Sequence, residues 1–186
     1  MSYARKSFVV FLIIFLFSAS VVFVDQQANV QVVTDDEYFS HAYDIIRAAN
    51  HEIEIIMFEM RYYPTYNYSK TNLLLKEIKK ASQRGVNVKI ILEGGEDYLG
   101  VGFKDNQAQI CNFFQNSSVL VRYDPSNITT HAKLLIADNY VLLGSTNWVY
   151  YSLKKNHETN VLIKSRQISS KFGHYFDVLW NQSVLC

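Results

Sequence analysis

The sequence predicts an α/β fold, a sandwich of helices around a mixed β-sheet, preceded by an N-terminal hydrophobic segment. Short apolar runs that indicate strands alternate with segments whose apolar residues recur at helical spacing. Two of these runs, 131–137 and 140–143, are separated only by Asp138-Asn139, which is typical of a β-hairpin. The composition, 49% hydrophobic and 19% charged, is that of a globular domain, and the net charge of +1 neither marks nor excludes a nucleic-acid binder.

The individual elements follow from start and stop signals. Thr34 and Glu37 form a capping box that predicts a helix with Thr34 as its N-cap, and Gly85 is the expected C-cap glycine of a second helix. The expected strands are 30–33, 52–57, 86–92, 119–122, 131–137, 140–143 and 159–163, and the expected helices are 35–49, 71–84, 105–115 and a last one from 165 onward.

Residues 1–25 form a separate hydrophobic segment. Arg5 and Lys6 precede the uncharged, mostly apolar run 7–24, whose length approaches the roughly 20 residues that span a bilayer. We therefore expect a signal anchor, with a signal peptide cleaved near Ser18 as the alternative. The domain that follows is then membrane-anchored and extracytoplasmic, or secreted or periplasmic after cleavage. The polar residues 26–31 are the expected linker, and 32–186 the single domain.

The two cysteines leave a choice open. Export permits a disulfide between Cys111 and Cys186, and a buried thiol together with a free C-terminal thiol is the alternative.

One segment carries the chemistry. It runs H-A-K-L-L-I-A-D from His131 to Asp138, and G-S-T-N follows from Gly144 to Asn147. His131 and Lys133 are two residues apart on a predicted strand, so both side chains should share one face of the sheet. At the end of the next strand, Ser145 and Asn147, with free N–H groups of a helix that could begin at Asn147, suit an anionic oxygen.

These residue types match the needs of phosphodiester cleavage. The reaction requires a nucleophile and donors for the phosphate oxygens. His131 is the expected nucleophile, and Lys133, Ser145 and Asn147 the expected substrate-binding donors. Glu158 is the carboxylate expected to orient an imidazole.

The pattern H-x-K-x4-D followed by G-S-x-N resembles the signature of the phospholipase D superfamily, and the resemblance extends over about 30–182. It is most similar to the small single-motif branch, with bacterial metal-independent endonucleases and mitochondrial-surface members. It implies a phospholipase D-like α/β/α sandwich, a catalytic domain at 32–186, a phosphohistidine intermediate, and neither metal nor cofactor. Asp138 takes the place of the family's motif Asp and completes the catalytic set, although its place in the hairpin turn favours a structural role.

The resemblance also implies a partner. The family mechanism uses two histidines, whereas this chain has one motif and no internal repeat, so we expect a homodimer with a composite active site. A nuclease acting on DNA or RNA is the first expectation, a membrane-associated lipid hydrolase the second, and a non-catalytic scaffold the third. The tyrosines at 62, 63, 66 and 68 could stack on bases, sit at a lipid interface or simply pack. The acidic run 93–97 argues against a tight DNA groove.

Overall fold

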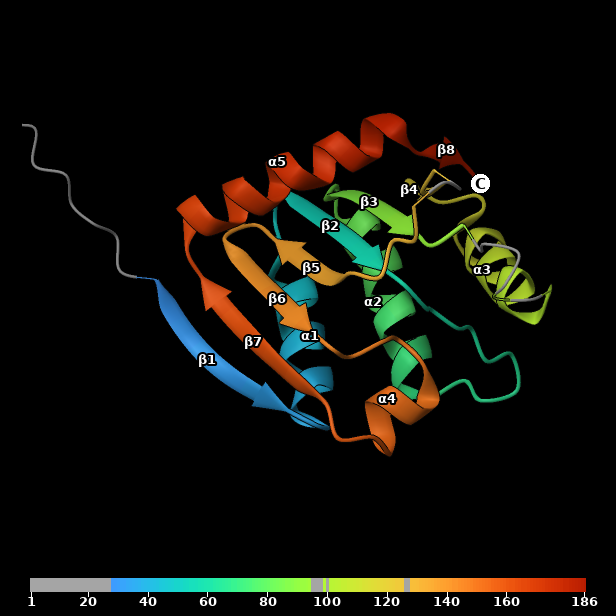
Figure 1. The fold of residues 1–186 in the computed structure, drawn as a ribbon, viewed down its shortest axis with the longest axis horizontal. Coiled ribbons are helices and arrows are strands. Elements are labelled where there is room, and N and C mark those ends of the chain that lie inside the picture. Colours follow the sequence, from blue (N-terminus) through green and yellow to red (C-terminus); the bar gives the residue numbers. More distant parts are fainter. Residues whose placement is uncertain (1–27, 95–98, 100, 126–127) are drawn as a thin grey trace, which may run out of the picture.

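The computed structural model describes residues 28–94, 99, 101–125 and 128–186. In this part of the chain the strands form one eight-stranded sheet in the order β1-β7-β6-β5-β2-β3-β4-β8 (Figure 1). The strands are β1 (Asn29–Thr34), β2 (Glu52–Met57), β3 (Asn87–Leu92), β4 (Val119–Tyr123), β5 (Lys133–Ala137), β6 (Tyr140–Gly144), β7 (Thr159–Lys164) and β8 (Val184–Leu185). The helices are α1 (Glu37–Ala48), α2 (Lys70–Gln83), α3 (Val101–Phe114), α4 (Tyr150–Lys154) and α5 (Arg166–Gln182).

The sheet is mixed, as the sequence predicts. β2, β3 and β4 are parallel, and the remaining neighbours are antiparallel. The predicted hairpin joins β5 to β6, and Asp138 in its turn adopts a φ of 50°, a conformation that Asp tolerates better than most residues. The α/β sandwich prediction is therefore confirmed.

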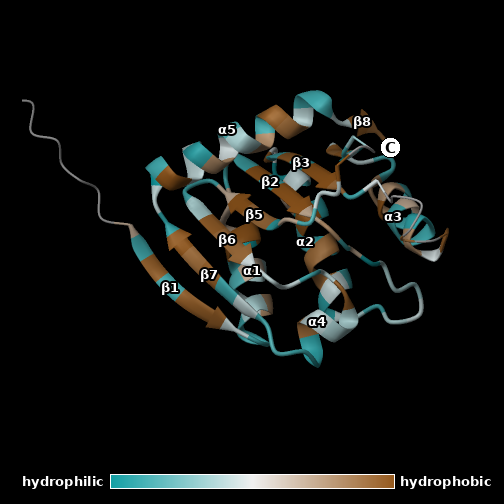
Figure 2. Ribbon diagram, viewed as in Figure 1, coloured by the Kyte–Doolittle hydropathy of each residue, from teal (hydrophilic) through white to brown (hydrophobic). Residues whose placement is uncertain are grey.

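Two hydrophobic layers hold the sandwich together. α1 and α2 cover one face of the sheet over a core that includes Ile55, Leu135 and Trp148. α5 crosses the other face, where Phe176 and Trp180 pack on the central strands (Figure 1). Figure 2 shows that hydrophobic residues are concentrated in the strands between these layers.

The edge formed by β1 is less well covered. Val30 and Val32 are 58% and 71% exposed, although Val32 pairs directly with the half-buried Val161 of β7. Paired residues of neighbouring strands project to the same face of a sheet. An apolar strip therefore continues from the core to the surface at β1.

Three local predictions need correction. α1 begins at Glu37 with Asp36 as its N-cap, because Asp35 turns the chain with a φ of 47°. Half of the capping box remains, since the N–H and hydroxyl of Thr34 donate to the Glu37 carboxylate over 2.9 and 3.0 Å. α3 begins four residues before the expected Asp105, and α4 and β8 were not predicted. Gly85, with a φ of 93°, ends the second helix as expected.

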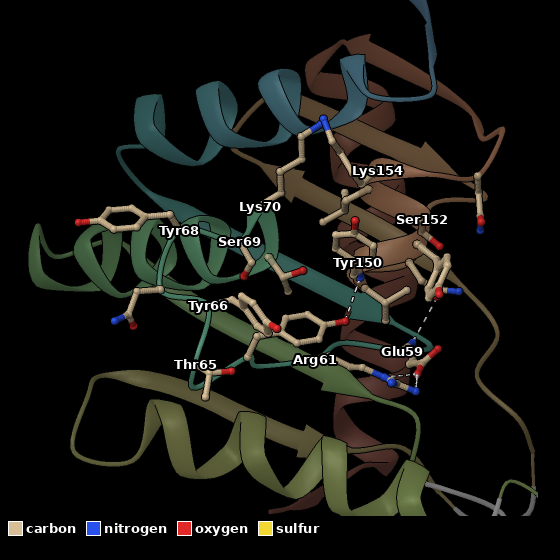
Figure 3. Close-up of a pocket in the computed structure, with 18 residues that line it drawn as sticks. Glu59, Arg61, Thr65, Tyr66, Tyr68, Ser69, Lys70, Tyr150, Ser152 and Lys154 are labelled. Atoms are coloured by element: carbon tan, nitrogen blue, oxygen red, sulfur yellow. Dashed lines mark hydrogen bonds and ion pairs between the residues drawn. The ribbon is translucent and has the colours of Figure 1, made fainter.

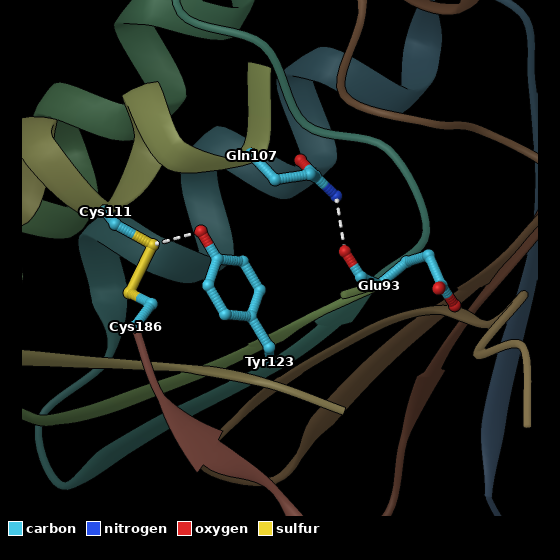
Figure 4. Close-up of a disulfide and its surroundings, with 5 residues drawn as sticks. All are labelled: Glu93, Gln107, Cys111, Tyr123 and Cys186. Atoms are coloured by element: carbon cyan, nitrogen blue, oxygen red, sulfur yellow. Dashed lines mark hydrogen bonds between the residues drawn. A yellow bond between two sulfur atoms is a disulfide. The ribbon is translucent and has the colours of Figure 1, made fainter. Parts of the chain in front are cut away.

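The cysteines form a disulfide, the first of the two alternatives. Cys111 of α3 is bonded to Cys186 with a Cα–Cα distance of 6.1 Å, and the Tyr123 hydroxyl lies 3.1 Å from the Cys111 sulfur (Figure 4). The bond spans 75 residues of sequence. Closing a loop of this length lowers the entropy of the unfolded chain and so stabilises the fold by roughly 4 kcal/mol. It fixes the C-terminus against α3.

The anchor and signal-peptide predictions fall on residues 1–25, which lie outside the described residues. Of the expected linker 26–31, Asn29 to Gln31 belong to β1 and pair with β7. Among the helices of the described residues, none combines the length and the apolarity needed to cross a membrane.

Candidate active site

His131 and Lys133 lie side by side where β5 begins. Lys133 is the first residue of the strand, and His131 precedes it, with the Ala132 carbonyl still accepting a 3.0 Å hydrogen bond from the N–H of Phe58. The Lys133 Nζ lies 3.2 Å from Nδ1 of His131 and 2.7 Å from its carbonyl oxygen. The two side chains are thus neighbours, as the spacing predicts, although only Lys133 belongs to the strand.

Phe58 supports both of these side chains, and sequence reasoning missed it. Its ring centroid lies 4.5 Å from that of His131, and Lys133 Nζ lies 4.8 Å from the same ring centroid. Phe58 directly follows β2, the antiparallel neighbour of β5. The sequence could have placed it only if the pairing of β2 with β5 had been known.

The electrostatics suit a nucleophile. Desolvation, aided by the neighbouring Lys133 ammonium, lowers the pKa of His131 below 6.5, so the imidazole is neutral at pH 7. Burial also lowers the pKa of Lys133, which is 7% exposed, while Glu158 and Glu59 act in the opposite direction. A neutral imidazole carries the lone pair that an attack on phosphorus requires.

The turn after β6 places Ser145. A Cβ on Gly144 would overlap the side-chain oxygen of Asn160 and the carbonyl oxygen of Thr159, so β6 and β7 approach closely only because residue 144 is glycine. Ser145 Oγ donates to Glu158 and accepts a 3.0 Å hydrogen bond from the N–H of Thr159. The Ser145 hydroxyl is therefore fixed by one donated and one accepted hydrogen bond.

Asn160 also holds this turn in place, and its role was not predicted. Its Oδ1 accepts from the N–H of Thr146 over 3.3 Å, and its Nδ2 donates to the Thr146 hydroxyl over 3.0 Å. Both residues are buried. An Asn two residues after the expected site carboxylate was the only sequence signal.

Asn147 closes the turn. Its Oδ1 accepts from the N–H of Glu59 over 3.3 Å, and the next residue, Trp148, is fully buried and donates to the Tyr38 hydroxyl over 3.0 Å. Trp148 thus packs beneath this turn. No helix starts at Asn147, however, because α4 begins only at Tyr150 and has five residues.

Glu158 is held by two donors of its own chain. Its carboxylate accepts from Ser145 Oγ and, over 3.1 Å, from Asn156 Nδ2. Within the described part of this chain, no hydrogen bond joins it to His131. Glu158 is nevertheless 6% exposed and raises the pKa of Lys133, so it belongs to the site's electrostatics.

Asp138 lies at the opposite end of β5, and its place in the catalytic set is corrected. The five residues of β5 separate it from the His131 end by roughly 3.3 Å per residue. Its carboxylate accepts the N–H groups of Asn50, His51 and Glu52 over 2.9, 3.0 and 3.0 Å. Burial raises the pKa of Asp138, but these hydrogen bonds outweigh burial and lower it. Asp138 is structural, as its turn position indicates.

A large open pocket adjoins Asn147. It has a volume of about 1390 Å³ and lies between the segment that joins β2 to α2 and helix α4 (Figure 3). Of the tyrosines singled out in the sequence, Tyr63, Tyr66 and Tyr68 line it, whereas Tyr62 packs on Phe113 with ring centroids 4.9 Å apart. The described residues contain no cluster of three or more His, Cys, Asp or Glu side chains placed to hold a metal ion.

Comparisons with known proteins agree with this architecture. A family model described as "Cardiolipin synthase, PLD-like domain" matches residues 42–180. Cardiolipin synthase B of Salmonella typhi is 32% identical over 114 residues, which cover 61% of this chain and 25% of that protein. Its counterpart in Escherichia coli K12 is 29% identical over 119 residues, covering 62% and 26%. The chain thus spans about a quarter of the length of these relatives.

Two solved structures share the fold over almost their whole length. Nuc from Salmonella typhimurium, a phospholipase D family member, superposes with a TM-score of 0.70 at 25% identity and covers 86% of this chain and 99% of its own. NucT from Helicobacter pylori superposes with a TM-score of 0.68 at 16% identity and covers 86% and 100%. At that lower identity the second likeness concerns the fold alone.

Proposed function

This chain belongs to the phospholipase D superfamily through the match of residues 42–180, and on that premise we propose that it is a metal-independent nuclease that cleaves phosphodiester bonds through a covalent intermediate on His131. The observation that carries the proposal is the contact of His131 with Lys133. A neutral, exposed imidazole stands beside a buried ammonium, with 3.2 Å between Nδ1 and Nζ.

The reaction proceeds in two displacements. An imidazole nitrogen of His131 attacks phosphorus, a P–N bond forms, and the P–O bond to the leaving group breaks with transfer of a proton to the departing oxygen. Water then attacks the phosphohistidine and gives a proton to the group that protonated the leaving oxygen, the P–N bond breaks, and the imidazole is regenerated. Lys133, Ser145 and Asn147 donate to the phosphate oxygens, whose charge grows in each transition state.

The reaction needs a proton donor for the leaving group, and this need favours a homodimer. His157 is the histidine nearest to His131 in sequence, but its side chain is 99% exposed and is paired with Asp35. A second copy of His131, brought across a two-fold axis, supplies the missing acid.

Nucleic acid is favoured over lipid as the substrate because the similarity to Nuc covers more of that relative than the similarity to the cardiolipin synthases does. This chain matches Nuc along 99% of the Nuc chain, whereas it matches only a quarter of each cardiolipin synthase. A lipid hydrolase is the second candidate, favoured by the cardiolipin synthase description of the family model. The hydrophobic residues 7–24 would tether either enzyme to a membrane with its catalytic domain outside the cytoplasm.

The full chain should hydrolyse bis-p-nitrophenyl phosphate in EDTA. His131→Ala should lose at least a thousandfold in rate, because no covalent intermediate can form, while His174→Ala on the exposed face of α5 should retain full activity. Parallel assays with single-stranded DNA, duplex DNA, RNA and phosphatidylglycerol vesicles decide the substrate. Turnover of lipid alone would replace the nuclease proposal, and inactivity on every substrate would favour a scaffold.

Sedimentation of the full chain tests the dimer. We expect a dimer at the concentrations used for activity. A fully active monomer would contradict the composite site.

A further inference from the structure

The pocket beside Asn147 offers two aromatic side chains that the fold does not use. Tyr66, from the segment before α2, is 69% exposed, and Tyr150, from the start of α4, is 46% exposed. They come from opposite walls, which are fastened together because the N–H of Tyr150 donates to the Tyr63 hydroxyl over 3.0 Å. In Figure 3 both rings lie in the middle of the pocket. Exposed rings on a fixed frame are platforms on which a planar group can stack.

One end of the pocket is cationic. The side chains of Lys70 and Lys154 converge there (Figure 3), and their ammonium groups interact electrostatically. Desolvation, reinforced by Lys154 and opposed by Asp36, lowers the pKa of Lys70. Within the described residues neither ammonium has a carboxylate within ion-pair distance, although Lys70 lies 5.4 Å from the Phe39 ring centroid. Two converging ammonium groups without a salt bridge favour a bound anion.

The first turn of α2 adds to this charge. Ser69, Lys70 and Thr71 line the pocket, and they stand at the N-terminus of a 14-residue helix, where the helix dipole is positive. The opposite end of the pocket is formed by Glu59 (Figure 3), whose N–H donates to Oδ1 of the pocket-lining Asn147. Asn147 is also one of the donors assigned to the scissile phosphate. The pocket therefore runs from Asn147, past two aromatic rings, to a second anion site.

We propose that this pocket is a nucleotide subsite that makes the enzyme selective for single strands, with an unstacked base between Tyr66 and Tyr150 and the adjoining phosphate at Lys70 and Lys154. The inference rests on the proposed nuclease function and adds a substrate class to it. In a single strand each sugar lies between two phosphates and carries a base at its side, which matches a pocket with aromatic rings between two anion sites. A base in a duplex is paired and stacked, and it would have to leave the helix before it could enter. An acyl chain would leave both ammonium groups unpaired in the pocket.

Removal of one aromatic wall tests the stacking. We compare kcat/KM of the full chain for a thymidine 12-mer with that for bis-p-nitrophenyl phosphate, which carries no nucleobase. In Tyr66→Ala and Tyr150→Ala the ratio of the two should fall about tenfold, the range of one base–aromatic stack, and Tyr66→Phe should restore it. Tyr175→Ala is the matched control, because Tyr175 is similarly exposed at 48% but lies on α5 and does not line the pocket.

A pair of adjacent lysines tests the anion site. Lys154 lines the pocket and its exposed neighbour Lys155 does not. Lys154→Gln should lower the slope of log KM against log salt concentration for the 12-mer by about 0.7, the value for one lost phosphate contact on a single strand, and Lys155→Gln should leave it unchanged.

The outcomes separate the two proposals. If the wild type cleaves the 12-mer and the tyrosine variants keep the wild-type ratio, the subsite is overturned and the nuclease stands. If the wild type cleaves only the small diester and lipid, the nuclease proposal fails and the subsite with it. If the wild type prefers duplex to single strands, the selectivity is overturned even when the tyrosines contribute to binding.

Discussion

Glu93 and Asp124 accept the same backbone N–H, that of Thr130, over 2.6 and 3.1 Å. Both carboxylates are buried, and Thr130 directly precedes His131. Asp124 also accepts the N–H of Gly94 over 2.6 Å. Glu93 is the first residue of the acidic run that argued against a DNA groove. Its carboxylate instead turns inward and anchors the segment that carries the nucleophile.

Truncation of Asp124 should loosen this anchor. Asp124→Ala removes one acceptor of the Thr130 N–H and leaves the Gly94 N–H without its bond to Asp124, so we expect a loss of about 3 kcal/mol in the free energy of unfolding. Urea denaturation measures it. Asp44→Ala, at an exposed position of α1, should change stability by less than about 0.5 kcal/mol. Equal effects of the two substitutions would contradict an anchoring role.

Replacement of Lys133 should raise the pKa of His131. Desolvation and the Lys133 ammonium together lower this pKa below 6.5, and Lys133→Met removes the charge while keeping most of the apolar volume. Titration of the imidazole by NMR in both proteins measures the difference, with His131→Ala to assign the resonance. An unchanged midpoint, or a shift shared by all five histidines, would count against the pairing.

Glu54 should make the fold less stable as the pH rises. Burial raises its pKa to about 7, against the opposing charge of Lys89 and with reinforcement from Glu52 and Asp177. Because the folded state then holds the proton more tightly than the unfolded chain, stability present below pH 4.5 is lost as the pH rises through about 7. The loss amounts to about 3 kcal/mol.

Glu54→Gln isolates this effect. The variant cannot ionise at this position, so its unfolding free energy should exceed that of the wild type by a margin that grows between pH 4 and pH 8. Urea denaturation across this range gives both curves. Parallel curves would show that Glu54 titrates normally.

Gly144→Ala should disrupt the turn that carries Ser145. The new Cβ would stand 2.6 Å from the Cα of Asn160, a backbone atom that cannot move without displacing β7. We expect a loss of about 3 kcal/mol measured by thermal unfolding, together with lower activity. Gly102→Ala in α3 is the matched control, because nothing lies within 4 Å of its Cβ, and it should stabilise the helix by about 0.5 kcal/mol. A wild-type melting temperature for Gly144→Ala would refute the close approach.

Local sequence patterns were sufficient to predict many of the elements of this fold. The hairpin turn at Asp138, the glycine at position 85 and the shared face of His131 and Lys133 each depend on residues a few positions apart, which is the range over which backbone preference acts. The motif from His131 to Asn147 could be recognised in the sequence for the same reason. Two antiparallel strands joined by a tight turn bring the start of β5 next to the end of β6 without help from the rest of the chain.

The tertiary structure decided what lies across the sheet and between loops. Phe58 reaches His131 through pairing of β2 with β5, and Glu93 reaches Thr130 across 37 residues of sequence. The partner of Glu158, the bond between Cys111 and Cys186 and the tyrosine pocket arise in the same way. Each depends on the order in which strands assemble, and that order is set by burial summed over the whole core rather than by any short stretch of sequence.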